Sequence, residues 1–180
     1  MKKKHILILF SLIVILCLLA FITYIIKTNN TAKALNVAND TLFSNSEEAE
    51  FLDANNNPIS LDNYKNTILV VNVWASWSPY AQIEFPILNE VAESFKDKDV
   101  HFLIMNRKEN QQQIERYLSS ISPYPNLEQI VDTNDFFYNG IDGYAMPETV
   151  IFDDKGRIIE HIRGVVDKDR LTAILEELTK

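Results

Sequence analysis

The chain has 180 residues and a net charge of −8, and 47% of its residues are hydrophobic. This length is enough for one domain with an extension. Residues 47–180 hold 12 of the 17 Lys and Arg residues and 24 of the 25 Asp and Glu residues. Such an acidic segment argues against nucleic-acid binding and against broad contact with anionic lipid.

The N-terminus carries a long uncharged run. Residues 6–26 contain no charged side chain, and Lys2, Lys3 and Lys4 precede them. A helix of this length spans roughly 31 Å, close to the thickness of a bilayer core. We therefore expect a cytoplasmic tail at 1–5 and a single membrane anchor at 6–26, with the rest of the chain outside the cytoplasm, in a periplasm or on the outer face. A cleaved signal peptide is the alternative, because Ala32-Lys33-Ala34 resembles a cleavage site.

Cys17 is the only cysteine, and it lies inside the apolar run. The exported part therefore has no thiol, no possible disulfide and no cysteine ligand for a metal. Residues 27–48 are polar and lack an apolar period, which is typical of a linker. We expect the folded domain to occupy residues 49–180 and to need no cofactor.

The domain alternates strand and helix patterns. Strands are predicted by the apolar runs 67–73 and 100–105, by 129–131, and by a first hairpin over 51–53 and 59–61 and a late hairpin over 149–153 and 157–163. Helices are predicted at 80–95, 110–119 and 168–178, with a helical turn at 135–139. This order indicates an α/β fold with a central mixed β-sheet flanked by helices.

The helix at 80–95 has apolar residues at helical spacing. Its predicted core face consists of Ile83, Ile87, Leu88, Val91 and Phe95. Ser78 is a favoured helix N-cap and Pro79 suits the next position, so we expect this pair to begin the helix. Pro86 lies inside the helix and is expected to kink it.

Residues 50–180 resemble the TlpA/ResA-type membrane-anchored thioredoxin-like proteins. The resemblance rests on the motifs Leu61-Asp62-Asn63-Tyr64, VVNVWASW at 70–77, Glu84 with Pro86, Met146-Pro147-Glu148-Thr149, VIFDDKGRI at 150–158 and Arg163-Gly164. It implies a thioredoxin-like fold and, as the family's activity, thiol–disulfide exchange.

The two cysteines of the family's WCxxC motif are missing. Their positions are held by Ser78 and Ala81. In the family the first cysteine is activated by the helix N-terminus. A serine hydroxyl does not cycle through a disulfide and alanine has no reactive group, so the dithiol reaction should be absent. His101 and His161 lie far from Ser78 in sequence, and nothing in their spacing indicates a catalytic pair or a metal site.

The resemblance also implies a substrate groove beside a cis proline. The groove would be lined by Trp77, Ser78, Pro79, Tyr80, Tyr144, Met146 and Pro147. In the family the residue before this proline pairs with an extended substrate strand. A requirement of the fold alone would equally explain Pro147. Asn72 stands where cytoplasmic thioredoxins carry a buried acid, and we expect it to shuttle no proton. We expect Glu84 to be a solvated carboxylate in the first turn of the helix.

Two classes of function follow. The first is a redox-inactive binding module that holds an extended peptide or a partner protein outside the cytoplasm. The alternative is a thiol–disulfide oxidoreductase that uses a thiol supplied by a partner. The absence of cysteine at 78 and 81 favours the binding module.

Overall fold

The computed structural model describes residues 14–25 and 51–180. Residues 14–25 form a helix with exposed side chains. The predicted anchor at 6–26 extends beyond this helix on both sides, and the predicted linker at 27–48 lies outside the described residues. No helix within these two ranges has the length and hydropathy needed to cross a bilayer. The anchor therefore stays a prediction.

A single seven-stranded mixed sheet organises residues 51–180, in the order β2-β1-β5-β4-β3-β6-β7. The strands are β1 (Phe51–Asp53), β2 (Pro58–Ile59), β3 (Ile68–Trp74), β4 (Val100–Arg107), β5 (Glu128–Asp132), β6 (Glu148–Phe152) and β7 (Ile158–Arg163). Strands β3, β4 and β5 are parallel, whereas β1, β6 and β7 pair in antiparallel fashion. Both predicted hairpins and the mixed strand directions are thereby confirmed.

Within residues 51–180, four helical segments connect strands and a fifth, α5, follows β7. They are η1 (Leu61–Tyr64), α2 (Ala81–Ser94), α3 (Gln111–Ser119), α4 (Phe136–Gly140) and α5 (Lys168–Leu178). Leu61 opens the 3-10 helix η1 rather than ending the first hairpin, because the Ser60 hydroxyl accepts the Asp62 N–H and caps that turn. The helix α3 begins with a complete capping box between Asn110 and Gln113, which explains why its start is readable from sequence.

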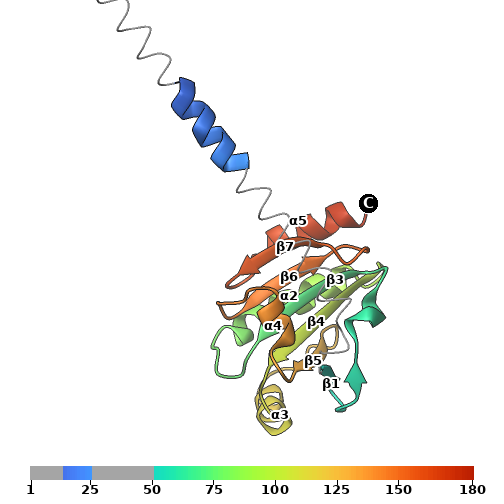
Figure 1. The fold of residues 1–180 in the computed structure, drawn as a ribbon. Coiled ribbons are helices and arrows are strands. Elements are labelled where there is room, and N and C mark those ends of the chain that lie inside the picture. The colour runs from blue at the N-terminus through green and yellow to red at the C-terminus, as the bar shows by residue number, and fades with distance from the viewer. Residues whose placement is uncertain (1–13, 26–50) are drawn as a thin grey trace, which may run out of the picture. The chain divides into compact units, whose positions relative to one another are not determined.

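The core has two layers, one on each face of the sheet. Alternate side chains of β3 point to opposite faces, so Val70 joins one cluster and Val71 the other. The first cluster receives apolar residues of α2, α3 and α5, and the second those of η1 and α4. In Figure 1 the strands cross the domain from β7, beside α5, to the hairpin of β1 and β2 at the opposite edge.

The core face of α2 differs from the predicted one. Its buried residues are Ala81, Glu84, Phe85, Leu88, Val91 and Ala92. Ile83 is 54% exposed and Ile87 is only partly buried, so the expectation for Ile83 was wrong. Glu84 accounts for the difference. It is fully buried and belongs to the core face, although a charged residue type predicts an exposed position. Pro86 lies within the helix, which continues past it to Ser94.

Candidate functional site

Three loops leave the same end of three adjacent strands. Residues 75–80 follow β3, residues 142–147 precede β6, and residues 164–166 follow β7. The strand ends are in register, because Glu148 pairs with Val73 on one side and with Arg163 on the other. We call these segments together the three-loop surface. It contains every residue of the predicted groove, so the sheet brings the two predicted halves together.

The loop after β3 presents aromatic side chains and buries the two former cysteine positions. Trp77 is 65% exposed and Tyr80 is 47% exposed. Ser78 and Ala81 retain only 3% and 1% exposure. A partner approaching this loop would therefore meet the two rings rather than the Ser78 hydroxyl.

Ser78 does not cap the helix, so that prediction was wrong. The N-cap of α2 is Tyr80, which makes no side-chain capping bond. Its carbonyl accepts the N–H groups of Ile83 and Glu84 at 3.0 Å, whereas the Ser78 N–H turns back to the Ala75 carbonyl. This tight turn places Ser78 before the helix and out of reach of its first N–H groups.

Glu84 lies at the centre of a buried polar network. Its carboxylate accepts the Val166 N–H and the Asn72 side-chain amide, each at 2.8 Å. The same Asn72 amide donates to Thr149 at 2.9 Å. Burial raises the pKa of Glu84 to about 7, although the bonds from Val166 and Asn72 act in the opposite direction. The prediction of a solvated carboxylate was therefore wrong, because the helix turns Glu84 toward the sheet.

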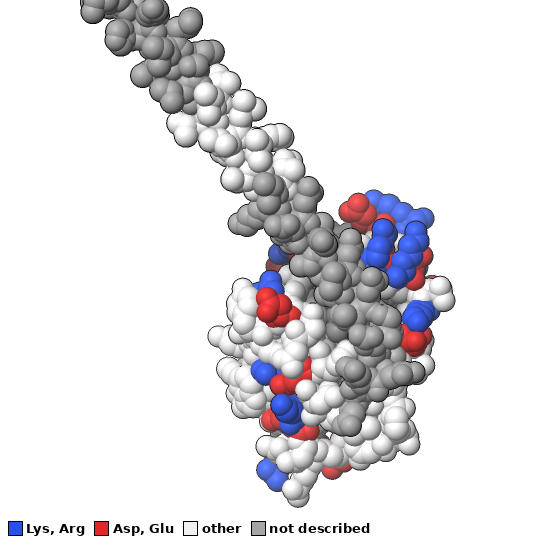
Figure 2. All heavy atoms as spheres, viewed as in Figure 1, with Lys and Arg blue, Asp and Glu red and all other residues white. Residues whose placement is uncertain are grey.

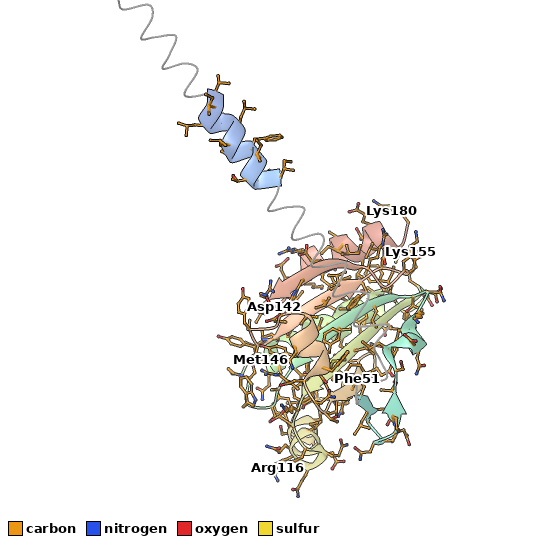
Figure 3. All side chains as sticks on the ribbon, viewed as in Figure 1. Phe51, Arg116, Asp142, Met146, Lys155 and Lys180 are labelled. Atoms are coloured by element: carbon orange, nitrogen blue, oxygen red, sulfur yellow. The ribbon has the colours of Figure 1, made fainter. Side chains whose placement is uncertain are left out.

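The loop before β6 contains the predicted cis bond, between Met146 and Pro147. Pro147 is buried and Met146 is half-buried, while Tyr144 is 76% exposed. Figure 3 labels Asp142 and Met146 on the same side of the domain.

The backbone around Met146 is almost fully hydrogen-bonded, but Met146 itself is not. The N–H groups of Tyr144 and Ala145 donate to Glu148, and the Ala145 carbonyl accepts the Tyr138 hydroxyl at 3.0 Å. The Pro147 carbonyl accepts the Gly164 N–H at 2.9 Å. Within residues 51–180 no hydrogen bond uses the N–H or the C=O of Met146. Met146 therefore offers a donor and an acceptor to an incoming strand.

Glu148 joins the loop before β6 to β7. It is fully buried, and its second oxygen lies 2.5 Å from Nε2 of His161 and 3.8 Å from Nε of Arg163. Burial lowers the pKa of His161, and the carboxylate of Glu148 opposes that shift. The Arg163 guanidinium also lies 4.7 Å from the centre of the Tyr144 ring. These contacts hold the exposed ring beside the strand end.

The third loop completes the surface with an apolar side chain. Gly164 has φ of +90°, a conformation that favours glycine, and donates to Pro147. Val166 is bound to Glu84, and Val165 between them is 38% exposed. Sequence reasoning missed the exposure of Val165 on this surface and of Ile83 in the first turn of α2, the helix that follows the loop after β3. Val165 is an apolar residue outside the predicted helix and strand periods, whereas the helical spacing assigned Ile83 to the core face.

The two former cysteine positions hold no thiol, and the single cysteine of the sequence is Cys17. His161 is engaged with Glu148, and His101 packs edge-on against Tyr64, so the rings contact other partners than Ser78. Across residues 14–25 and 51–180, no three His, Cys, Asp or Glu side chains cluster in a way that could hold a metal ion.

Comparison with known proteins identifies the relatives of the chain. The Redoxin family model matches residues 27–177. The thiol-disulfide oxidoreductase ResA of Geobacillus kaustophilus is 26% identical over 179 residues, which cover 99% of each chain. The enzyme of the same name from Geobacillus thermodenitrificans is also 26% identical, over 184 residues and 99% of each chain.

Solved structures share the fold. DsbF of MTB superposes with a TM-score of 0.65 at 20% identity, covering 74% of this chain and 96% of that one. The pneumococcal exposed lipoprotein thioredoxin from Streptococcus pneumoniae superposes with a TM-score of 0.63 at 21% identity, covering 72% of this chain and 98% of that one. The α/β fold described above is therefore the thioredoxin-like fold. The chain belongs to the Redoxin family, as a TlpA/ResA-like thioredoxin relative with Ser78 and Ala81 in place of the two active-site cysteines.

Proposed function

We propose that this protein is a redox-inactive thioredoxin relative that binds an extended segment of a partner protein at its three-loop surface. The observation that carries the proposal is the free backbone of Met146, which lies between the hydrogen-bonded backbone groups of Ala145 and the hydrogen-bonded carbonyl of Pro147. A residue with an unused N–H and C=O at a strand end can pair with an added strand. An extended polypeptide supplies the matching groups at the required spacing.

The side chains around Met146 suit such a partner. Trp77, Tyr80 and Tyr144 are exposed rings, a residue type enriched at protein interfaces, and Ile83 and Val165 add aliphatic area. In Figure 2 the side of the domain on which Figure 3 labels Met146 is mostly white, with scattered charged side chains. This composition favours a segment with apolar side chains over a highly charged one.

Covalent capture is absent from this proposal. The relatives named thiol-disulfide oxidoreductase belong to the same family, but here the former cysteine positions hold Ser78 and Ala81. Binding would therefore depend on backbone pairing and a few aromatic contacts, which are expected to dominate the affinity.

We also propose that the domain is held at the outer side of a membrane by residues 6–26. The uncharged run and the lysines before it support this placement. The description of one structural neighbour as an exposed lipoprotein thioredoxin is in keeping with it. Protease digestion of intact cells should remove the domain and leave the N-terminus protected. A mature protein that begins near Leu35 would instead show cleavage.

Site-directed photo-crosslinking in the native host tests the binding function. A photoreactive residue is placed at Trp77, Tyr144 or Met146, and at two control positions, Ile159 and Glu176. Ile159 is 43% exposed but lies toward the other end of β7 from Arg163. We expect one discrete adduct shared by the three surface positions and missing from both controls. Adducts that form equally at the control positions would contradict the proposal.

A further inference from the structure

Two loops of the three-loop surface carry aromatic side chains, namely the loop after β3 and the loop before β6. In each of them a carboxylate accepts hydrogen bonds from backbone N–H groups of the loop. We propose that Glu109 and Glu148 are positioning residues that fix these loops before a partner arrives. The purpose assigned to them rests on the proposed function, whereas their effect on the loops is measurable without any partner. Neither residue belongs to the former dithiol positions or to the predicted groove.

Glu109 holds the loop that carries Trp77. One of its oxygens accepts the Ser76 N–H at 2.7 Å, and the other contacts the Ser76 hydroxyl at 2.6 Å. The carboxylate is oriented in turn by Asn106, which is fully buried and donates to it at 2.8 Å. Glu109 therefore joins the end of β4 to the residue immediately before Trp77.

The backbone at the end of β4 is shaped to deliver this carboxylate. Lys108 has φ of +60°, a left-handed conformation that is strained for a residue with a side chain. Its N–H donates to the Asp132 carbonyl at 3.0 Å, so the turn is anchored to β5. The reversal directs the next residue, Glu109, across to the loop after β3.

Glu148 holds the loop that carries Tyr144 and Met146. One oxygen accepts the N–H groups of Tyr144 and Ala145, at 2.8 and 2.5 Å. The other contacts His161, so the carboxylate is fixed from both sides. Asp142, the first residue of this loop, is also left-handed, with φ of +53°.

The two contacts have a common consequence for binding. Each satisfies backbone donors next to an exposed ring, and neither carboxylate occupies the N–H or C=O of Met146. Loops that are already ordered lose less conformational entropy when a partner binds. The surface is thereby preorganised rather than assembled by the partner.

Backbone amide hydrogen exchange on the full-length chain tests the positioning. Glu109 and Glu148 are each replaced by alanine, which removes the acceptor, and by glutamine, which keeps one side-chain carbonyl. Glu90→Ala and Glu160→Ala are the matched controls, since both side chains are surface ion-pair partners outside the three loops.

We expect Glu148→Ala to accelerate exchange roughly tenfold at Tyr144 and Ala145, and Glu109→Ala to do so at Ser76, with β3 unchanged. The glutamine variants should keep most of the protection, and the two controls should match the wild type. If an alanine variant fails to fold, exchange at the same loop amides is measured in the glutamine variant instead. We expect protection close to that of the wild type there, because glutamine keeps one carbonyl as acceptor.

Exchange that rises equally in β3 and in the loops would show a role in overall stability alone and contradict positioning. Loop amides that stay protected in both alanine variants would also contradict it. The binding proposal fails separately, through the loss of position-specific crosslinks, so the two failures are distinguishable.

Discussion

Asn72 donates a 2.8 Å hydrogen bond to Glu84 at a point where both side chains are buried against the sheet. The other amide atom of Asn72, Oδ1, is buried without a hydrogen-bond partner. The Glu84 carboxylate is thus shielded from solvent and lies beside an amide whose oxygen has no hydrogen-bond donor. Desolvation of the carboxylate raises the pKa of Glu84 to about 7, and the hydrogen bond from Asn72 opposes the shift.

The raised pKa predicts that stability falls as the pH rises from about 4.5 to 7. In that range the unfolded state releases the Glu84 proton and the folded state retains it. A shift of this size corresponds to about 3 kcal/mol between the two ends of the range. Asp132, whose pKa burial raises to about 6, acts in the same direction. His161 changes stability in the opposite direction, because its pKa is lowered in the folded state. Its effect falls at pH values below its ordinary pKa of 6.5.

Glu84→Gln should remove much of this pH dependence and raise the free energy of unfolding at pH 8. A glutamine amide can donate to an acceptor such as the unused Asn72 Oδ1, and it has no charge to bury. Urea denaturation at several pH values measures the effect, with Glu90→Gln on the exposed face of the same helix as control. A Glu84→Gln variant less stable than the wild type at pH 8 would show that the charged form is needed.

The purified protein should neither reduce insulin nor oxidise dithiols above a no-protein control, because it has no cysteine besides Cys17. Replacing Ser78 and Ala81 together by cysteine should create a disulfide that glutathione buffers titrate reversibly. The single variant Ser78→Cys is the control, since its one new thiol has no partner at position 81. Turnover by the unmodified protein would contradict the redox-inactive assignment.

Gly143 is predicted to be intolerant of a side chain. A Cβ at this position would lie 2.5–2.8 Å from ring atoms of Tyr138, whose hydroxyl binds Ala145. Gly143→Ala should therefore cost about 1–3 kcal/mol of stability by overpacking. A double-mutant cycle checks the cause, because the cost should shrink when Tyr138 is replaced by leucine. An undiminished cost would place the effect in the backbone instead.

Much of the fold is readable from sequence because its elements have strong local signals. The buried strands are continuous apolar runs, the helix α3 has a capping box, and the predicted bounds of α5 match the observed Lys168–Leu178. The position of the three-loop surface follows from the family resemblance and the cis proline.

Tertiary contacts explain what sequence reasoning missed. Glu84 reads as a surface residue, but a donor 82 residues away, the Val166 N–H, helps to bury it. Glu109 contacts Ser76 across 33 residues, so no local pattern reveals its role. Ile83 was assigned to the core because periodicity cannot separate an apolar side chain in the core from one exposed at a surface.

The central claim is that an extended partner binds at the three-loop surface. Calorimetric titration of the segment that crosslinks through position 146 tests it, with the wild type and the variants Trp77→Ala, Ile83→Ala and Ile159→Ala. We expect Trp77→Ala to cost about 1–4 kcal/mol of affinity, Ile83→Ala to cost less, and Ile159→Ala to change nothing measurable. An affinity that is equal in all four proteins would contradict the claim and place the binding surface elsewhere.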